Sequence, residues 1–396
     1  MRILILVFLL LCIGVMFLFS QNSSSLTIQN PDSGKFIERM DKEMGNAKNT
    51  EKYTFKWVNA KDLTVEGMGW SGTGVIDDYT RLPNNYKDTV TANVWNLSRH
   101  SSGIHVRFTV KGTKEIHAKW KLRSNIFMVH MTHQAINGLD LYIKQDGKWV
   151  FGGVGKPDKT GLDNESLLTG FLDPKVEYEC MVYLPLYNGV NTVEFGFASD
   201  AQVKKATPFH NKPFVMYGTS ILHGCSASRA GMSFPSMLGR RFDAPVVNLG
   251  FSGNGFIEEY FGRIMGEVDA LAYFIDCLPN MYSFTPDEVK SRTLALVRNL
   301  RKVRPQTPVV LVEDRTHTNF RSNSTVNEDR DGLKAAYKIL KKESENIYYV
   351  KSDNLLGKDT EATVDGSHPS DLGMHYYYQA LEPVVKKIMK VSKKSY

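Results

Sequence analysis

The hydrophobic pattern of this chain changes near residue 208, and that change constrains the fold more than any other feature. Between residues 52 and 200, apolar and polar side chains alternate in short stretches that are separated by turn residues. Alternation with a period of two is typical of strands that are buried on one face. Many short strands of this kind predict a β-sandwich over residues 52–200. The clearest stretches are 105–110, 116–122, 139–143 and 192–197, and Asp146-Gly147 is expected to form a hairpin turn after the third.

Residues 208–396 show a different pattern, in which continuous apolar runs alternate with helical stretches. Strands that are covered on both faces read as uninterrupted apolar runs, and they occur mainly in parallel sheets. The alternation of strand and helix therefore predicts an α/β domain with a doubly wound, mostly parallel sheet. The polar stretch between residues 200 and 212 would separate this domain from the β-sandwich. The expected strands are 214–217, 246–249, 270–275, 309–312 and 347–350.

Three helices can be bounded from their capping residues and periodicity. The sequence T-P-D-E at residues 285–288 has the form of a capping box, in which the threonine caps the helix and the glutamate caps it in return. This helix is expected to continue to about Val303, because Pro305 would end it. A second helix is expected over residues 327–344, and a third from Ser370 toward the C-terminus.

The first 20 residues have the composition of a secretory signal. Arg2 precedes an apolar run over residues 3–19, and the chain then turns polar. The run approaches the ~18–20 residues that span a bilayer, so a retained membrane anchor is the alternative. A lipoprotein reading through Cys12 is weaker, because little of the hydrophobic segment precedes it. Residues 21–51 would then be a linker.

Composition excludes some classes of protein. Three cysteines follow the signal, Cys180, Cys225 and Cys277, and an odd number excludes a complete disulfide framework. Their spacing does not fit a zinc site, so no metal or other cofactor is expected. The net charge is +7 at pH 7, but the basic residues are scattered. We therefore expect no nucleic-acid partner and, once the signal is removed, no stable membrane partner.

Polar or glycine-rich segments follow three of the expected parallel strands. Ser220 follows the first strand, residues 250–255 follow the second, and residues 276–280 follow the third. The carboxyl ends of parallel strands lie at one edge of a sheet, where ligands bind in such folds. The three segments are therefore expected to line one site.

Ser220, Asp365 and His368 are the residue types of a hydrolytic triad. A serine hydroxyl becomes a nucleophile when an imidazole accepts its proton and a carboxylate orients that imidazole. Asp365 lies three residues before His368, a spacing that can hold the carboxylate beside the ring on one loop. Each signal has an ordinary alternative. Ser220 would cap the following helix, and His368 with Pro369 would form a turn before a helix.

Two segments offer hydrogen-bond donors for an oxyanion. The loop 248–255 is rich in glycine, so its backbone N–H groups can approach a ligand, although a tight turn would also need glycine. Asn280 carries a neutral amide donor, and its alternative is a simple turn residue.

The order of these segments resembles that of the SGNH, or GDSL-like, hydrolase superfamily. The four sequence blocks of that family look like four segments of this chain, namely 218–220, 248–255, 276–280 and 365–368. The resemblance implies a flavodoxin-like hydrolase domain in which Ser220, His368 and Asp365 are catalytic. It also implies an oxyanion hole formed by the backbone N–H groups of Ser220 and Gly253 and by the side chain of Asn280.

Two departures look like those of one branch of the family. Thr219 stands where aspartate is usual, and residues 276–280 read D-C-L-P-N rather than G-x-N-D. Members of that branch carry an N-terminal β-domain with a G-x-D-L-Y signature, which residues 138–142 match. Residues 81–83 and 95–100 also look like parts of that domain, and the whole resemblance covers about residues 52–390.

Other polar residues are candidates for substrate contact. His223 lies in the serine loop, and Glu313 and His317 follow the fourth expected parallel strand. For these residues, a satisfied loop histidine or a surface ion pair is a comparable alternative. Cys225 is disfavoured as a nucleophile because no basic partner is evident in the sequence. Asp140 of the G-x-D-L-Y signature is expected to be structural.

These observations predict an exported, metal-independent serine esterase that acts through an acyl-enzyme. Export, the accessory β-domain and family habit favour an acylated glycan as the substrate, with other small esters, lipid esters and thioesters as alternatives. A rival from another class is a carbohydrate-binding protein whose hydrolase domain is inactive. The presence of Ser220, Asp365 and His368 argues against that rival. The β-domain would either bind glycan or only shape the catalytic cleft.

Overall fold

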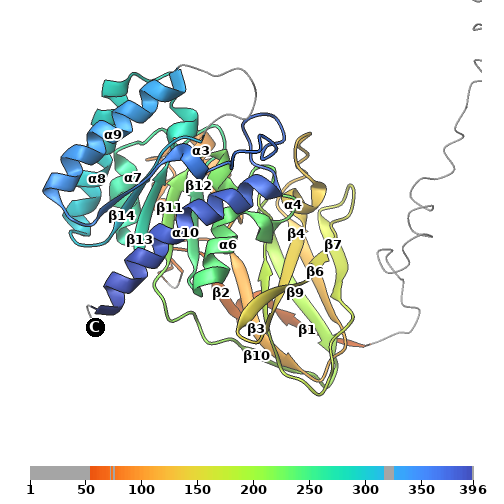
Figure 1. Ribbon diagram of the computed structural model, residues 1–396. Helices are drawn as coiled ribbons and strands as arrows, with labels where there is room; N and C mark the ends of the chain where they lie inside the picture. The colour runs from red at the N-terminus through yellow and green to blue at the C-terminus, as the bar shows by residue number, and fades with distance from the viewer. Residues whose placement is uncertain (1–53, 72, 75, 316–324, 395–396) are drawn as a thin grey trace, which may run out of the picture. The chain divides into compact units, whose positions relative to one another are not determined.

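The structure is a computed structural model that describes residues 54–71, 73–74, 76–315 and 325–394 (Figure 1). The predicted signal at residues 1–20 and the predicted linker at residues 21–51 lie outside the described residues. Among the helices that are described, none combines the length and the apolar character that crossing a lipid bilayer requires.

Two antiparallel sheets form the first part of the described chain, which confirms the β-sandwich. The strand order is β1-β9-β4-β7 in one sheet and β10-β3-β8-β5-β6 in the other, where β2 also pairs with β3. Both sheets contribute to one apolar core, which includes Phe108, Trp120 and Phe195. The strands are β1 Phe55–Asn59, β2 Thr64–Glu66, β3 His105–Lys111, β4 Ile116–Leu122, β5 Leu139–Gln145, β6 Lys148–Gly155, β7 Asp163–Thr169, β8 Tyr178–Tyr183, β9 Val190–Ala198 and β10 Gln202–Lys205.

The hairpin between β5 and β6 turns at the predicted Asp146-Gly147 pair. Both residues have positive φ angles, 48° and 73°. A two-residue loop of type I′ needs positive φ at both positions, which Asp-Gly accepts at low cost. Gln145 therefore pairs directly with Lys148 across the turn.

Strand β3 differs from the expected half-buried pattern, because both of its faces are covered. His105 and Arg107, which alternation places on the outer face, are only 3% and 4% exposed. Arg107 Nη1 donates to Glu66 Oε2 at 2.8 Å, and the guanidinium stacks over the ring of Phe209. A buried ion pair and the segment after β10 thus cover the face that the sequence pattern assigned to water.

Five parallel strands form the second part, which confirms the doubly wound α/β fold. Their order is β12-β11-β13-β14-β15. Counted along the chain this order is 2-1-3-4-5, which is the flavodoxin-like arrangement. All five apolar runs predicted from the sequence are strands. They are β11 Phe214–Gly218, β12 Val246–Gly250, β13 Ala272–Asp276, β14 Val309–Val312 and β15 Ile347–Val350.

Helices cover both faces of the parallel sheet (Figure 1). Helices α6 and α10 pack with Phe214 and Val310 on one face. Helices α7, α8 and α9 pack with Val215 and Leu311 on the other. The helices are α3 Ala92–Ser98, α4 His133–Asn137, α5 Ser220–His223, α6 Phe234–Phe242, α7 Tyr260–Glu267, α8 Pro286–Val303, α9 Thr325–Glu343 and α10 Asp371–Lys394.

The predicted capping box is present at the start of α8. The N–H of Glu288 donates to Thr285 Oγ1 at 3.3 Å, and the N–H of Thr285 donates to Glu288 Oε2 at 2.7 Å. These reciprocal bonds satisfy two donors that the first turn of a helix leaves free. Helix α8 ends at Val303 as predicted. Helices α9 and α10 begin at Thr325 and Asp371, close to their predicted starts.

Part of the chain before β3 packs on the parallel sheet rather than within the sandwich. Trp70, Leu82 and Val94 share an apolar core with Val247 and Phe261. The indole N–H of Trp70 also donates to Glu267 at 2.7 Å. Residues between β2 and β3, both strands of the sandwich, therefore support the α/β part. The domain boundary near residues 200–208 stays a prediction.

Candidate active site

Ser220 follows the carboxyl end of strand β11, which lies between β12 and β13. Thr219 caps the short helix α5 by accepting the N–H of Ile221 at 3.4 Å, so Ser220 is the first helical residue and not the cap. Its hydroxyl oxygen lies 3.0 Å from Nε2 of His368. Gly218, two residues before Ser220, has to be glycine, because a Cβ there would come within 2.5 Å of the carbonyl oxygen of Asp276.

His368 and Asp365 are held together on one loop before α10. Nδ1 of His368 lies 2.7 Å from Asp365 Oδ2. The other carboxylate oxygen, Oδ1, accepts the backbone N–H groups of Ser367 at 2.9 Å and His368 at 2.7 Å. Asp365 thus fixes the loop with one oxygen and the imidazole with the other. This leaves Nε2 of the Nδ1–H tautomer free to accept the proton of Ser220.

The surroundings of His368 favour its protonated form. The pKa of His368 is raised to about 9, first by a hydrogen bond with the thiol of Cys225 and then by Asp365, against an opposing effect of burial. Burial acts to raise the pKa of Asp365, but the hydrogen bonds from His368 and Ser367 outweigh it and the pKa is lowered. The pair therefore suits an ionised carboxylate beside an imidazolium.

Cys225 is a neighbour of the imidazole that sequence reasoning missed. Helix α5 ends in a left-handed turn at Gly224, with φ of 103°. The N–H of Cys225 then donates back to the carbonyl of Ser220 at 2.9 Å, which brings its thiol to His368. The left-handed turn at Gly224 is the backbone feature that turns the chain here, and a glycine at that position was its sequence signal.

The candidate oxyanion donors leave the same sheet edge as Ser220. Gly218 pairs with Gly250 of β12 and with Asp276 of β13, so the loops after all three strands start side by side. Gly253 is exposed, with φ of 64° and open space where a Cβ would point. Asn280 ends the short helix Leu278–Asn280, and its Nδ2 donates to the carbonyl of Asn254. A second amide proton remains for an oxyanion.

Two candidate substrate-binding residues occupy buried positions. His223 is 0% exposed, and its Nε2 lies 2.9 Å from the carbonyl oxygen of Leu186. Glu313 accepts the hydroxyl of Tyr349 at 2.6 Å and the N–H of Ser352 at 2.7 Å. Neither side chain offers much exposed surface to a substrate. His317, the third candidate, lies outside the described residues.

Arg315, in the segment after β14 for which the sequence suggested substrate contact or a surface ion pair, instead supports the loop of the imidazole. Its side chain is 3% exposed and pairs with Asp314. Nε donates to the carbonyl of Ser367 at 3.3 Å, and Nη2 donates to the hydroxyl of the same residue. The strand end after β14 therefore fixes the residue next to His368.

The sandwich also reaches the candidate site. The ring of His130, from the segment before α4, stacks on the ring of His368 with centroids 5.6 Å apart. The hydroxyl of Ser226 donates to the carbonyl of His130 at 3.2 Å, which ties this segment to the loop after α5. One wall of the candidate site is thus built from the antiparallel part of the chain.

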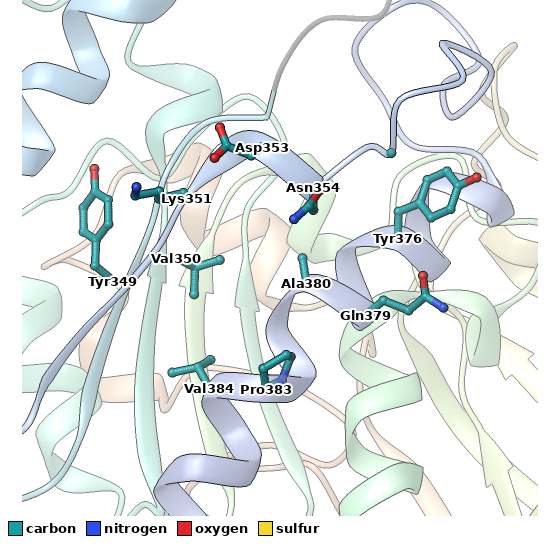
Figure 2. Close-up of a pocket in the computed structure, with 11 residues that line it drawn as sticks. Tyr349, Val350, Lys351, Asp353, Asn354, Tyr376, Gln379, Ala380, Pro383 and Val384 are labelled. Carbon is teal, nitrogen blue, oxygen red and sulfur yellow. The ribbon is translucent and has the colours of Figure 1, made fainter.

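A separate cavity lies between β15 and α10. It has a volume of about 650 Å³ and is lined by polar and aromatic side chains, among them Lys351, Asp353 and Tyr376 (Figure 2). Ser220, Asp365 and His368 do not line it. The groups with hydrolytic geometry therefore do not belong to this cavity.

A serine, an imidazole and a carboxylate in hydrogen-bonded sequence, at the carboxyl edge of a doubly wound sheet, are the arrangement of an esterase of the α/β class. Sequence comparison supports this class. The model of the GDSL-like lipase/acylhydrolase family matches residues 211–386. The model of the GxDLY domain, the N-terminus of SGNH-type esterases, matches residues 55–203. No curated protein matches the chain.

Solved structures give the same assignment. The chain is 35% identical to a protein of Bacteroides ovatus described as a GDSL-like lipase, with a TM-score of 0.78 over 85% of this chain and 98% of that one. This chain therefore belongs to the GDSL-like lipase/acylhydrolase family and is a carboxylic ester hydrolase of the SGNH type.

More distant structures share the fold. A salicylyl-acyltransferase from a tetracycline biosynthetic pathway is 16% identical, with a TM-score of 0.67 over 82% of this chain and 95% of its own. A family two carbohydrate esterase of Cellvibrio japonicus is 13% identical, with a TM-score of 0.57 over 85% of this chain and 98% of its own. At these identities the likeness concerns the fold alone.

Proposed function

We propose that this protein is an exported serine esterase that hydrolyses an O-acyl ester of a carbohydrate through an acyl-enzyme on Ser220. The observation that carries the proposal is the pair of contacts at His368. Its Nε2 lies 3.0 Å from Ser220 Oγ, and its Nδ1 lies 2.7 Å from Asp365 Oδ2. Both distances allow a hydrogen bond, and together they connect the nucleophile, the base and the orienting group.

Acylation begins when Ser220 Oγ attacks the carbonyl carbon of the ester and its proton passes to Nε2 of His368. The carbonyl oxygen becomes an oxyanion, which the backbone N–H groups of Ser220 and Gly253 and the amide of Asn280 would stabilise. Asp365 stabilises the imidazolium that forms. His368 then gives the proton to the oxygen of the leaving alcohol as its bond to the acyl carbon breaks.

Deacylation repeats these steps with water. A water molecule attacks the acyl carbon on Ser220 and gives a proton to His368. The bond between the acyl carbon and Ser220 Oγ then breaks, and His368 returns the proton to that oxygen. The carboxylic acid leaves, and the free enzyme is restored.

The carbohydrate substrate is supported by analogy, and the export by the N-terminal sequence. Carbohydrate esterases of family two share the fold with this chain at 12–13% identity, and one of them is described in complex with cellohexaose. The apolar run at residues 3–19 supports export. Lipid esters and thioesters use the same acyl chemistry, so they remain the alternative substrates.

The test is hydrolysis of 4-nitrophenyl acetate and 4-nitrophenyl butyrate by the full-length protein beside its Ser220→Ala variant. We expect release of nitrophenol by the wild type and loss of this release in the variant. Circular dichroism would establish that the variant is folded. Equal rates in both folded proteins would remove Ser220 as the nucleophile.

The substrate class is tested next with acetylated xylan and with triacylglycerol, measuring the acid released. Acetate release from the glycan that depends on Ser220 supports the carbohydrate esterase. Fatty-acid release without acetate release would favour a lipase. Binding of the glycan without release of acid would favour the rival, a carbohydrate-binding protein.

A further inference from the structure

The G-x-D-L-Y signature lies where the sandwich contacts the loop of the nucleophile. Its residues alternate in direction along β5. Leu139 and Leu141 belong to the apolar core of the sandwich. Asp140 and Tyr142 face the opposite way and contact the segment that follows α5. The signature thus has one face that builds the sandwich and one face that meets the α/β part.

Asp140 is the centre of that contact. Its carboxylate is fully buried. Arg229 Nη1 donates to Oδ1 at 2.9 Å and to Oδ2 at 2.7 Å. The N–H of Gly231 donates to the same carboxylate at 2.7 Å. Arg229 Nη1 also donates to the hydroxyl of Tyr142 at 2.7 Å. All the donors described around Asp140 come from residues 229–231.

The approach of this segment to the signature leaves no room for a side chain at residue 231. A Cβ on Gly231 would come within 2.3 Å of the ring of Tyr142 and within 2.6 Å of Asp140 Oδ2. Arg240 covers the same place by donating to the carbonyl of Gly231 at 2.8 Å and stacking over Tyr142. The segment therefore packs directly against the signature, and residue 231 has to be glycine for this approach.

The same segment holds the start of α10. The N–H of Ser228 donates to Asp371 Oδ1 at 2.8 Å, and its hydroxyl donates to Asp371 Oδ2 at 2.5 Å. Asp371 lies three residues after His368 and is the first residue of α10. On its other side, Ser228 offers its carbonyl to the hydroxyl of Thr132 from the sandwich, at 2.5 Å.

We propose that the G-x-D-L-Y signature positions the catalytic groups: Asp140 and Tyr142 hold residues 225–231, and this segment sets the place of His368 relative to Ser220 through Ser228 and Asp371. The segment begins directly after the helix of Ser220 and ends on the sandwich, so it links both catalytic loops to one rigid strand. The proposal rests on the proposed function of Ser220 and His368.

A simple stabilising role is the alternative for this ion pair. Buried ion pairs add little net stability compared with apolar residues, because desolvation offsets their attraction. Their value in fixing one arrangement is a better reason for three directed hydrogen bonds at a single carboxylate. A positioning role also predicts an effect that stability alone does not, namely a loss of kcat at constant KM in folded protein.

The test compares Asp140→Asn, Tyr142→Phe and Ser228→Ala in the full-length protein with a matched control, Glu66→Gln. Glu66 is also a buried sandwich carboxylate paired with an arginine, since Arg107 Nη1 donates to it at 2.8 Å. The measurements are kcat and KM for 4-nitrophenyl acetate, the melting temperature, and hydrogen exchange of the backbone amides in residues 362–371.

We expect Asp140→Asn and Ser228→Ala to lower kcat by about 10- to 100-fold, since small displacements of reacting groups have effects of this size. KM should change little, and the amides of residues 362–371 should exchange faster. In the double variant Asp140→Asn/Ser228→Ala, the losses of kcat, expressed as free energies, should not add, because both substitutions act through one segment. Glu66→Gln should lower the melting temperature and leave kcat and this exchange unchanged.

Wild-type kcat and wild-type exchange in folded Asp140→Asn and Ser228→Ala would overturn the proposal, and so would additive losses in the double variant. If Asp140→Asn does not fold, Ser228→Ala and Tyr142→Phe decide, since each removes only one hydroxyl. If the wild type shows no turnover that depends on Ser220, the proposed function fails. The exchange of residues 362–371 then decides the positioning role by itself.

Discussion

Arg81 donates from Nη1 to the carbonyl oxygen of Gly250 at 2.7 Å, so an arginine near the start of the described chain holds the end of β12. The same nitrogen donates to the carbonyl of Asn248 at 3.1 Å, and Nε and Nη2 donate to the carbonyls of His100 and Leu97. Burial lowers the pKa of Arg81 to about 9, which still leaves it charged at neutral pH. The glycine-rich loop that carries Gly253 therefore starts from a carbonyl fixed by a buried cation.

Replacing Arg81 with methionine should destabilise the protein and lower its activity. The change leaves several buried carbonyl groups without donors, and each such group costs about 1–3 kcal/mol. Denaturant unfolding would measure the loss of stability, and turnover of 4-nitrophenyl acetate by the folded fraction would measure the loss of activity. Arg99→Met is the control, because the Arg99 guanidinium contacts residues between 77 and 98. Equal activity in both variants would contradict a role for Arg81 in the glycine-rich loop.

The three residues of the triad should differ in the activity that remains after substitution. Ser220→Ala and His368→Ala should each reduce kcat to near the background rate. Asp365→Ala should retain about 100-fold more activity than either, because orientation contributes less than the nucleophile or the base. Single-turnover kinetics with 4-nitrophenyl acetate would rank the three variants.

A further variant separates the two tasks of Asp365. Asp365→Asn keeps an oxygen for the N–H groups of Ser367 and His368 but no longer favours the Nδ1–H tautomer. It should therefore lose activity while the loop keeps its structure. Wild-type activity in Asp365→Asn would contradict the orienting role.

The fold was readable from the sequence because its signals are local. Apolar runs such as residues 309–312 are strands with every residue buried, and the capping box at residues 285–288 marks the start of α8. The shared edge of Ser220, Gly250 and Asp276 followed from the rule that parallel strands end at one side of a sheet. Each of these inferences needs only a few neighbouring residues.

The contacts around the candidate site were not readable, because they join residues far apart in the chain. Arg229 meets Asp140 across 89 residues, and Arg81 meets His223 across 142. A sequence pattern indicates which face of a strand is polar but not which partner covers it. The buried His105 and Arg107 of β3 show the same limit, since the sequence assigned their face to water.

Activity should rise with pH, and the apparent pKa of this rising limb of the pH profile should lie above the ordinary pKa of histidine. The pKa of His368 is raised to about 9, and only the unprotonated imidazole accepts the proton of Ser220. Below this pKa the base is protonated, so kcat/KM falls as the pH is lowered. A pH profile of kcat/KM with 4-nitrophenyl acetate would locate the limb.

Cys225→Ala should move that limb to lower pH. A hydrogen bond with the Cys225 thiol is the leading cause that raises the pKa of His368, and alanine removes it. Cys180→Ala is the control, since this thiol is buried in strand β8 of the sandwich. Superimposable profiles for wild type, Cys225→Ala and Cys180→Ala would show that the thiol does not tune the imidazole.

Because the carboxyl group of Asp276 is buried, the free energy of unfolding should fall as the pH rises from about 4 to about 7. Burial, and then the nearby Asp314, raise the pKa of Asp276 from 3.8 to about 7. The folded state therefore binds this proton more tightly than the unfolded state. Below both pKa values the carboxyl is neutral in either state. Between the two pKa values the unfolded state loses its proton first and is stabilised relative to the folded state. Above about 7 this effect on the free energy of unfolding stays constant.

Three pKa units correspond to about 4 kcal/mol, so Asp276→Asn should gain stability over the wild type by up to this amount at pH ~8 and by little at pH ~4. Urea unfolding of both proteins at the two pH values would measure it, with the exposed Asp287→Asn as the control. A difference between wild type and Asp276→Asn that does not change with pH would contradict the raised pKa.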